Sequence, residues 1–223
     1  MSDGQKNSAS EWIEEIIKIV CYISLPLILL FTGTMISSVI FSGNINTDVN
    51  AASDFFQVLV SFSFPMLISL AIIPIAIQVF LQHNNFERLG FVKKPKRWSF
   101  IVCVALSAII VLVTIYLNKK LETEISAMTI CIHFLAVAIS EEVILRSVIM
   151  HEMKNIISNN FLLCIINAII FAFVYHSSED FLSNLLVRVP LGFVLSYARL
   201  KSNDIYLPIA LHWAYNMAVT AIG

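Results

Sequence analysis

Seven apolar segments, each long enough to form a helix, follow one another along this chain of 223 residues. Only 13% of the residues are charged, against about 25% in an ordinary soluble domain. Because a transmembrane helix needs about 20 apolar residues, we expect an all-α fold, a polytopic transmembrane helical bundle. The expected helices cover residues 16–41, 55–81, 99–117, 126–150, 160–176, 181–200 and 205–222.

Lysine and arginine are spread unevenly over the polar segments between these helices. Such residues are enriched in cytoplasmic loops, and here they gather after the second expected helix, whereas the loop before it has none. We therefore expect an N-terminus in the cytoplasm and an external C-terminus, in a membrane that we expect to be bacterial. The basic residues form no extended face, so the expected surroundings are the lipid bilayer and not nucleic acid. Those expected inside are Lys6, Lys18, Arg88, Lys93, Lys94, Lys96, Arg97, Arg146, Lys154, Arg199 and Lys201.

Three ionisable residues stand close together in the fourth apolar segment, namely Glu141, Glu142 and Arg146. A charge at membrane depth is costly, so such residues are candidates for a functional site. Glu142 and Arg146 are one helical turn apart and can form an ion pair, which lowers the cost of burying both. Glu141 points roughly 100° away and has no such partner, which suits a general base. The alternative is that the three charges cap a helix end at the lipid interface.

Histidines occur in two later apolar segments, with His176 at the end of the fifth and His212 in the seventh. Asn216 follows His212 by one helical turn, so both side chains point into one groove. A single histidine in an apolar helix is more often a packing residue than a catalyst. Two histidines, an asparagine and two glutamates on three helices favour a shared site instead.

The spacing between Glu141 and His176 predicts that these two residues meet. Residues 158–160 form the obvious turn between the fourth and fifth helices, and the two residues lie almost equally far from it. In an antiparallel hairpin they would therefore reach the same depth. The fifth helix would then end inside the bilayer, and residues 177–180 would line a wet cavity, because irregular backbone is tolerated at that depth only there.

Taken together, these motifs resemble the CAAX protease and bacteriocin-processing (CPBP, or Abi) family of intramembrane endopeptidases. The resemblance covers about Thr129 to Gly223, the last four expected helices. It rests on Glu141-Glu142-x-x-x-Arg146, on an aromatic-rich helix that ends at His176, and on His212-x-x-x-Asn216. The segment Arg88-Leu89-Gly90-Phe91 is similar to the loop that precedes this core in the family.

The resemblance implies a division of the chain and has one departure. Residues 126–223 would form the catalytic core, after a polar tail at 1–15 and three transmembrane helices within 16–125. The family usually has phenylalanine four residues before the first histidine, and this chain has Ala172 there, between Phe171 and Phe173.

By position, the resemblance also implies what each residue does. Glu141 would activate a water molecule, which His176 would help to hold. His212 and Asn216 would stabilise the oxyanion that forms when the scissile carbonyl is attacked. Glu142 and Arg146 would hold their helix in place and tune Glu141.

No cofactor is required by a mechanism with glutamate-activated water, which we favour. Two histidines, a glutamate and an amide oxygen could also bind a divalent metal such as Zn²⁺. The sequence has no HExxH stretch, and asparagine is a poor zinc ligand, so whether a metal takes part stays open at this point.

The expected function is hydrolysis of a peptide bond in a membrane-associated or secreted peptide or protein. Peptide maturation, bacteriocin self-immunity and regulated proteolysis all fit, whereas CAAX cleavage needs prenylated substrates, which bacteria ordinarily lack. The alternatives are a small-ion or proton carrier and a non-catalytic immunity scaffold. The chain has no internal repeat of the kind that many carriers show, and the complete set of six candidate residues argues against a scaffold.

Overall fold

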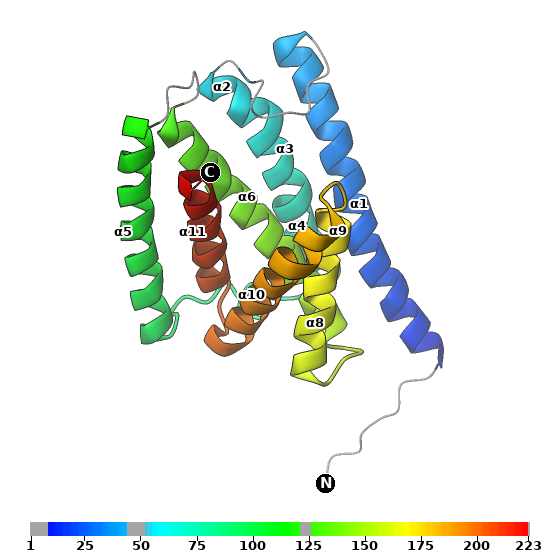
Figure 1. The fold of residues 1–223 in the computed structure, drawn as a ribbon. Helices are drawn as coiled ribbons and strands as arrows, with labels where there is room; N and C mark the ends of the chain where they lie inside the picture. Colours follow the sequence, from blue (N-terminus) through cyan, green and yellow to red (C-terminus); the bar gives the residue numbers. More distant parts are fainter. Residues whose placement is uncertain (1–8, 44–51, 53, 121–125, 223) are drawn as a thin grey trace.

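The computed structural model describes residues 9–43, 52, 54–120 and 126–222. All regular secondary structure in these ranges is helical, which confirms the expected all-α class (Figure 1). Several helices join end to end, so the described residues make seven continuous helices, close to the expected ranges. These are α1 (Ala9–Ser42), α2 to α4 (Phe55–Leu81), α5 (Arg97–Lys120), α6 and α7 (Ala127–Met153), α8 with the turn that extends it (Asn160–Tyr175), α9 and α10 (Phe181–Ser202), and α11 (Tyr206–Ile222).

Five of these helices in the described ranges are long and apolar enough to cross a membrane, so the chain is an integral membrane protein. The other two are shorter. The helix Asn160–Tyr175 is apolar, and α11 has 17 residues. Both belong to the part of the chain that carries the two candidate histidines.

Helix α1 begins earlier than the sequence suggested. A polar tail was expected over residues 1–15, but the helix already begins at Ala9, and residues 1–8 lie outside the described part of the chain. Glu11 lies in the first turn, where the helix dipole favours a negative charge. Lys18 pairs with Glu14 and Glu15 one turn before it, at 3.3 and 2.9 Å, and such pairs stabilise a helix.

Three prolines inside the long helices are accommodated by wider turns, whereas Pro26 lies within the regular α-helix α1. Pro65, Pro74 and Pro190 each stand two residues after a π-helical segment. A proline lacks the N–H of an ordinary turn, and its ring collides with a carbonyl one turn earlier. A π-helical turn before the proline relieves this conflict without ending the helix. The three segments are Leu59–Ser63, Ile68–Ile72 and Asn184–Arg188.

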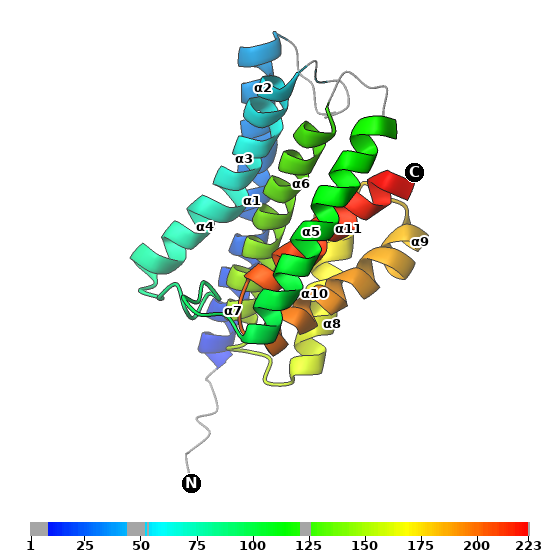
Figure 2. The same ribbon diagram turned by 90° about the vertical axis from the view of Figure 1, so that its left-hand side faces the viewer.

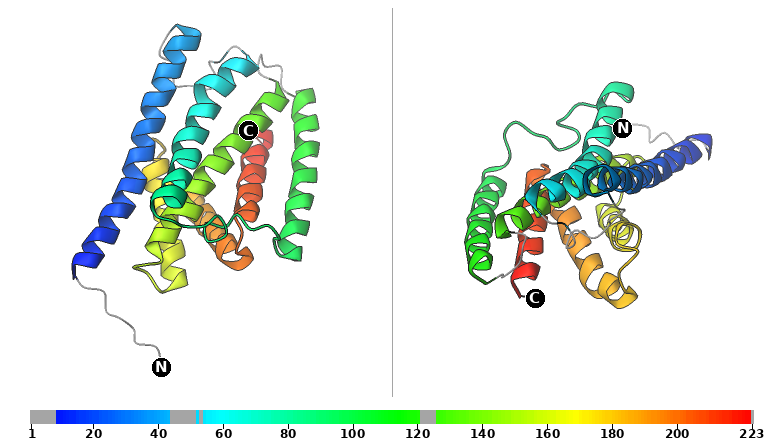
Figure 3. Two further views of the ribbon diagram at one scale, coloured as in Figure 1. Left: turned by 180° about the vertical axis from the view of Figure 1, so that it is seen from behind. Right: turned by 90° about the horizontal axis from the view of Figure 1, so that it is seen from above.

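The continuous helix of α6 and α7 runs through the middle of the bundle (Figure 2). Seen from behind, α1, the helix of α2 to α4, α6 and α5 stand in a row, and α8, α10 and α11 cover one face of that row (Figure 3). Helix α11 packs against α5 and α6, and α10 packs against α8 and α11. The central helix is therefore enclosed by others along most of its length.

The fifth helix stops inside the bundle. It begins at Asn160, where the side chain of Asn159 accepts hydrogen bonds from the backbone N–H groups of Phe161 and Leu162. It ends at Tyr175, and the turn before α9 lies at mid-height of the bundle and not at its edge (Figure 1). The connection between α7 and α8 covers residues 154–159, somewhat earlier than the expected turn at 158–160, and the early end of the fifth helix agrees with the expectation from the spacing.

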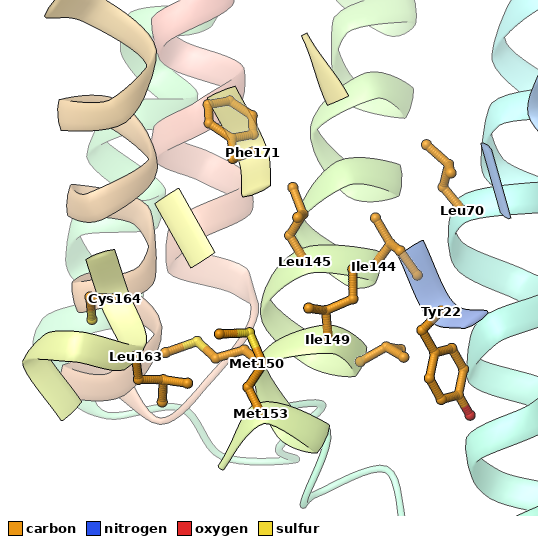
Figure 4. Packing of buried hydrophobic residues seen from close by; sticks show 11 residues of the cluster. Tyr22, Leu70, Ile144, Leu145, Ile149, Met150, Met153, Leu163, Cys164 and Phe171 are labelled. Atoms are coloured by element: carbon orange, nitrogen blue, oxygen red, sulfur yellow. The ribbon is translucent and has the colours of Figure 1, made fainter. Parts of the chain in front are cut away.

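A buried hydrophobic cluster fixes the rotation of the central helix. Side chains from α1, the α2 to α4 helix and α8 converge on its C-terminal half (Figure 4). Because this packing holds the helix from several sides, the polar residues just before it on the same helix are also fixed in direction. The cluster includes Tyr22, Leu70, Ile144, Leu145, Ile149, Met150, Met153, Leu163, Cys164 and Phe171.

Candidate active site

Glu142 and Arg146 form the expected ion pair at the centre of the bundle. The Nη1 atom of Arg146 donates to Oε1 of Glu142 at 3.0 Å, and both side chains are fully buried. A second donor of Arg146, Nη2, reaches the carbonyl of Gly192 in α10 at 3.2 Å. The guanidinium also lies 4.9 Å from the centre of the Phe171 ring. The pair therefore ties the central helix to α10 and to the end of α8.

His212 also contacts Glu142, which the sequence did not predict. Its Nδ1 atom lies 2.8 Å from Oε1 of Glu142, at hydrogen-bond distance. The imidazole of His212 is buried, and its other nitrogen, Nε2, lies 3.9 Å from Oε2 of Glu141. One carboxylate thus holds both Arg146 and the histidine of α11, so Glu142 sets the direction in which Nε2 points.

Glu141 faces the two histidines. Its Oε2 atom lies 3.6 Å from Nε2 of His176, so the two residues do meet at one depth, as the spacing predicted. Both distances to histidine exceed that of a hydrogen bond, and neither Oε2 of Glu141 nor Nε2 of His176 has a hydrogen-bond partner among the described residues. Oε2 of Glu141 and Nε2 of His176 therefore face each other across a gap.

A cavity of about 290 Å³ connects the candidate residues. Glu141, His176, His212 and Asn216 line it, whereas Glu142 and Arg146 do not. Glu141 and Glu142 are neighbours in sequence but differ in surroundings, because only the first one borders open space. The remaining lining is largely apolar, with the charged exceptions of Glu179 and Arg188.

The departure at Ala172 is explained by the helix geometry before His176. Residues Phe171–Tyr175 are π-helical, and in such a turn each backbone hydrogen bond spans five residues instead of four, so the turn holds about one extra residue. Phe171, five residues before the histidine, therefore takes the place expected four residues before it. Its ring meets those of His176 and His212 edge to face, at centroid distances of 4.8 and 5.8 Å. Ala172 is fully buried.

The backbone of His176 is held from the next helix. The carbonyl of His176 accepts hydrogen bonds from Nδ2 of Asn184 at 3.0 Å and from the backbone N–H of Glu179 at 3.1 Å. Asn184 is buried. The sequence gives no sign of this contact, because a polar side chain at the start of a helix has no spacing that links it to a particular histidine.

Two charged residues on the cavity wall were also missed as site residues, although one gave a signal. Nη2 of Arg188 and Oε1 of Glu179 form an ion pair at 2.6 Å. Arg188 is a charged residue within an apolar span, as Arg146 is. Because a charge at membrane depth is costly, Arg188 was equally a candidate for a functional site. Glu179 lies in the turn expected to line a wet cavity, and the structure places it there.

Among the described residues, no group of three or more histidine, cysteine, aspartate or glutamate side chains is arranged to hold a metal ion. The nearest approach to such a group is Glu141 with His176 and His212. Nδ1 of His212 is directed at Glu142, and its Nε2 atom faces Glu141.

The fold and the site define a class of protein, a helical membrane protein with a glutamate and two histidines around a partly open cavity. Residues 123–218 match the family model described as type II CAAX prenyl endopeptidase Rce1-like, so this part of the chain is a domain of that family. The match confirms the resemblance seen in the sequence, and since the family consists of peptide-bond hydrolases, residues 123–218 form a domain of the intramembrane endopeptidase type. No curated protein and no solved structure matches the chain.

Proposed function

We propose that this protein hydrolyses a peptide bond in a membrane-associated or secreted peptide or protein by means of a water molecule activated by Glu141. The observation that carries the proposal is the position of Glu141. Its carboxylate borders the cavity, and its Oε2 atom faces two imidazoles without a hydrogen bond to either. Peptide maturation, bacteriocin self-immunity and regulated proteolysis are the roles that suit such an activity.

In the proposed reaction, one water molecule binds between Glu141 and His176. Glu141 takes a proton from this water molecule while the water oxygen attacks the scissile carbonyl carbon, and a tetrahedral intermediate forms. The C–N bond then breaks, and the proton held by Glu141 passes to the leaving amine. Such a general base typically contributes about 10²–10⁴-fold to the rate.

His212 and Asn216 are proposed to stabilise the oxyanion. Both line the cavity on one face of α11, and donors fixed before the reaction stabilise the charge that develops on the carbonyl oxygen. Nδ1 of His212 is directed at a carboxylate oxygen, so it acts as a donor there. To donate from Nε2 as well, His212 must act as the imidazolium.

Glu142 and Arg146 are proposed as positioning residues, because neither lines the cavity. Glu142 accepts from the guanidinium of Arg146 and lies at hydrogen-bond distance from Nδ1 of His212. Since the cluster is enclosed by helices, these partners lower the cost of burying the carboxylate.

The first prediction tests the base. We expect Glu141→Gln to keep the folded protein and to lose cleavage by about 10²–10⁴-fold, since the amide keeps the shape but cannot take the proton. The measurement compares the membrane-bound and secreted peptides of cells that carry the wild type or the variant, with melting of the purified protein as the check on folding. Glu142→Gln is the matched variant. Equal peptide patterns for the wild type and both variants would disprove the proposed protease function. Loss of cleavage in Glu142→Gln alone would show that Glu142 is the general base and Glu141 the positioning residue.

The second prediction concerns orientation, which we propose to be N-terminus inside. The loop with Asn85 and the C-terminal end of α5 with Asn118 lie at opposite ends of the bundle (Figure 2), and both residues are exposed. In a cysteine-free background, a cysteine at Asn118 should react with an impermeant thiol reagent added to intact cells, and one at Asn85 should not. The reverse pattern would place the substrates on the other side of the membrane.

A further inference from the structure

The cavity contains one ion pair that the proposed reaction does not use, between Arg188 and Glu179. The two side chains come from different elements, since Arg188 ends the π-helical segment before α10 and Glu179 lies in the turn after His176. Both line the same cavity as Glu141 and His212. A charged pair at this place is therefore within reach of anything that binds next to the scissile bond.

The two partners differ in how firmly they are held. The side chain of Arg188 is 17% exposed and that of Glu179 is 45% exposed. Glu179 occupies one terminal nitrogen of the guanidinium, and the Nε atom of Arg188 is buried without a hydrogen-bond partner among the described residues. Arg188 is thus a fixed cation with an unused donor, whereas Glu179 sits on an irregular segment and can turn away.

We propose that Arg188 is the binding site for a carboxylate of the substrate, and that Glu179 occupies this site until the substrate displaces it. This inference rests on the proposed protease function and names a substrate class for it, namely peptides with a carboxylate close to the scissile bond. The carboxylate of Glu179 shows that the space beside the guanidinium accepts this group. A planar guanidinium suits such a ligand because it offers parallel donors to both oxygens.

The carboxylate has two sources in a peptide, the free C-terminus and the side chain of aspartate or glutamate. The chemistry of recognition is the same for both. Because Arg188 and Glu141 border a single cavity of about 290 Å³, either source must lie within a short distance of the bond that is cut.

The two members of the ion pair should respond in opposite directions, which a purely structural pair would not do. Loss of Arg188 removes the site, so peptides with a carboxylate should bind less well. Loss of the negative charge of Glu179 removes the competitor, so the same peptides should bind better. If the pair only holds the turn to α10, both losses should lower cleavage of every peptide alike.

The experiment uses the full-length protein in proteoliposomes and a library of synthetic peptides, with products identified by mass spectrometry. Each peptide is supplied with a free or amidated C-terminus, and with aspartate and glutamate or with asparagine and glutamine. We expect Arg188→Gln to lower kcat/KM for carboxylate-bearing peptides by about 10–100-fold, the effect of losing hydrogen bonds to a charged group. The loss should appear in KM, and cleavage of the amidated, neutral forms should not change. Glu179→Gln should lower KM for the carboxylate-bearing forms.

The double variant Glu179→Arg with Arg188→Glu exchanges the charges and keeps an ion pair, so it tests recognition even if a single variant folds poorly. We expect it to lose the preference for carboxylate-bearing peptides. If it instead restores wild-type cleavage of all peptides, or if Arg188→Gln affects all peptides equally, the inference is wrong. Whether amidation or side-chain neutralisation abolishes the preference identifies the source of the carboxylate. No cleavage by the wild type above that of Glu141→Gln would instead reject the proposed protease function itself.

Discussion

The central helix of α6 and α7 and the outer helix α5 show two different uses of a helix in a bilayer. In the most apolar stretch of the central helix, 61% of the residues are buried by the rest of the protein, compared with 11% in α5. Yet the central helix carries Glu141, Glu142 and Arg146, whereas α5 has no charged side chain between Arg97 and Lys119. The helix that avoids lipid is the less apolar one.

Charged side chains in such a protein are tolerated where other helices enclose them. An outer helix faces lipid along most of its circumference and therefore needs apolar side chains there. An enclosed helix contacts mainly protein and can carry charged side chains that have partners. Apolar residues on α5 therefore keep the helix in the membrane, and few of them contribute to packing. Three variants of the protein test this contrast, each with a matched change in the other environment.

The largest effect is expected for Arg146→Ala. It leaves Glu142 as an uncompensated buried charge, at a cost of about 3–5 kcal/mol, so we expect lower abundance in the membrane as well as lost activity. The matched change is Lys119→Ala at the exposed end of α5, which should alter stability by less than about 0.5 kcal/mol. Thermal unfolding in detergent measures both. A stable Arg146→Ala protein would show that the ion pair does not support the fold.

A smaller effect is expected for Ile110→Ala on α5. Ile110 is fully buried against the neighbouring helices, and Ile109 beside it is 51% exposed. Since lipid is as apolar as the protein interior, only the cavity left by the smaller side chain costs stability, on the order of 1–2 kcal/mol. Ile109→Ala should have almost no effect on the unfolding temperature. Equal losses from the two variants would contradict the view that α5 packs through one narrow face.

The smallest effect is expected for a buried hydrogen bond. Asn167 donates to the carbonyl of Leu145 at 2.9 Å and accepts from Ser196 at 2.9 Å, and so links three helices. Asn167→Ala should cost about 0.6–1.7 kcal/mol, the range for hydrogen bonds between membrane helices. Thr32→Ala on α1 is the control, because its hydroxyl bonds only to carbonyls of its own helix. We expect no measurable change there, and an equal loss would mean that the interhelical bonds add nothing.

Much of the fold could be predicted from the sequence because the information is local. Apolar runs gave seven helices whose observed bounds differ by a few residues, except at α1, where Glu14, Glu15 and Lys18 pair and extend the helix into the polar tail. The pairing of Glu142 with Arg146 follows from the spacing within one helix. The meeting of Glu141 and His176 follows from counting residues on both sides of one turn.

The contacts that could not be predicted depend on how distant helices are rotated against each other. Nothing in the spacing of His212 indicates that Nδ1 turns to Glu142 and not to Glu141. Likewise, the pairing of Arg188 with Glu179 depends on the path of the turn after His176. Such contacts are set by the packing of α10 and α11 on the central helix, which no pattern within a single segment records.

The π-helical turn before His176 also affects how such proteins can be found. A search motif that requires phenylalanine four residues before the histidine rejects this chain, because Ala172 stands at that position. The ring of Phe171 nevertheless contacts both histidines, one residue earlier in the sequence. Search motifs for membrane helices should therefore allow one extra residue at a π-helical turn. In a sequence alignment, a gap at that turn places residues with the same contacts in one column.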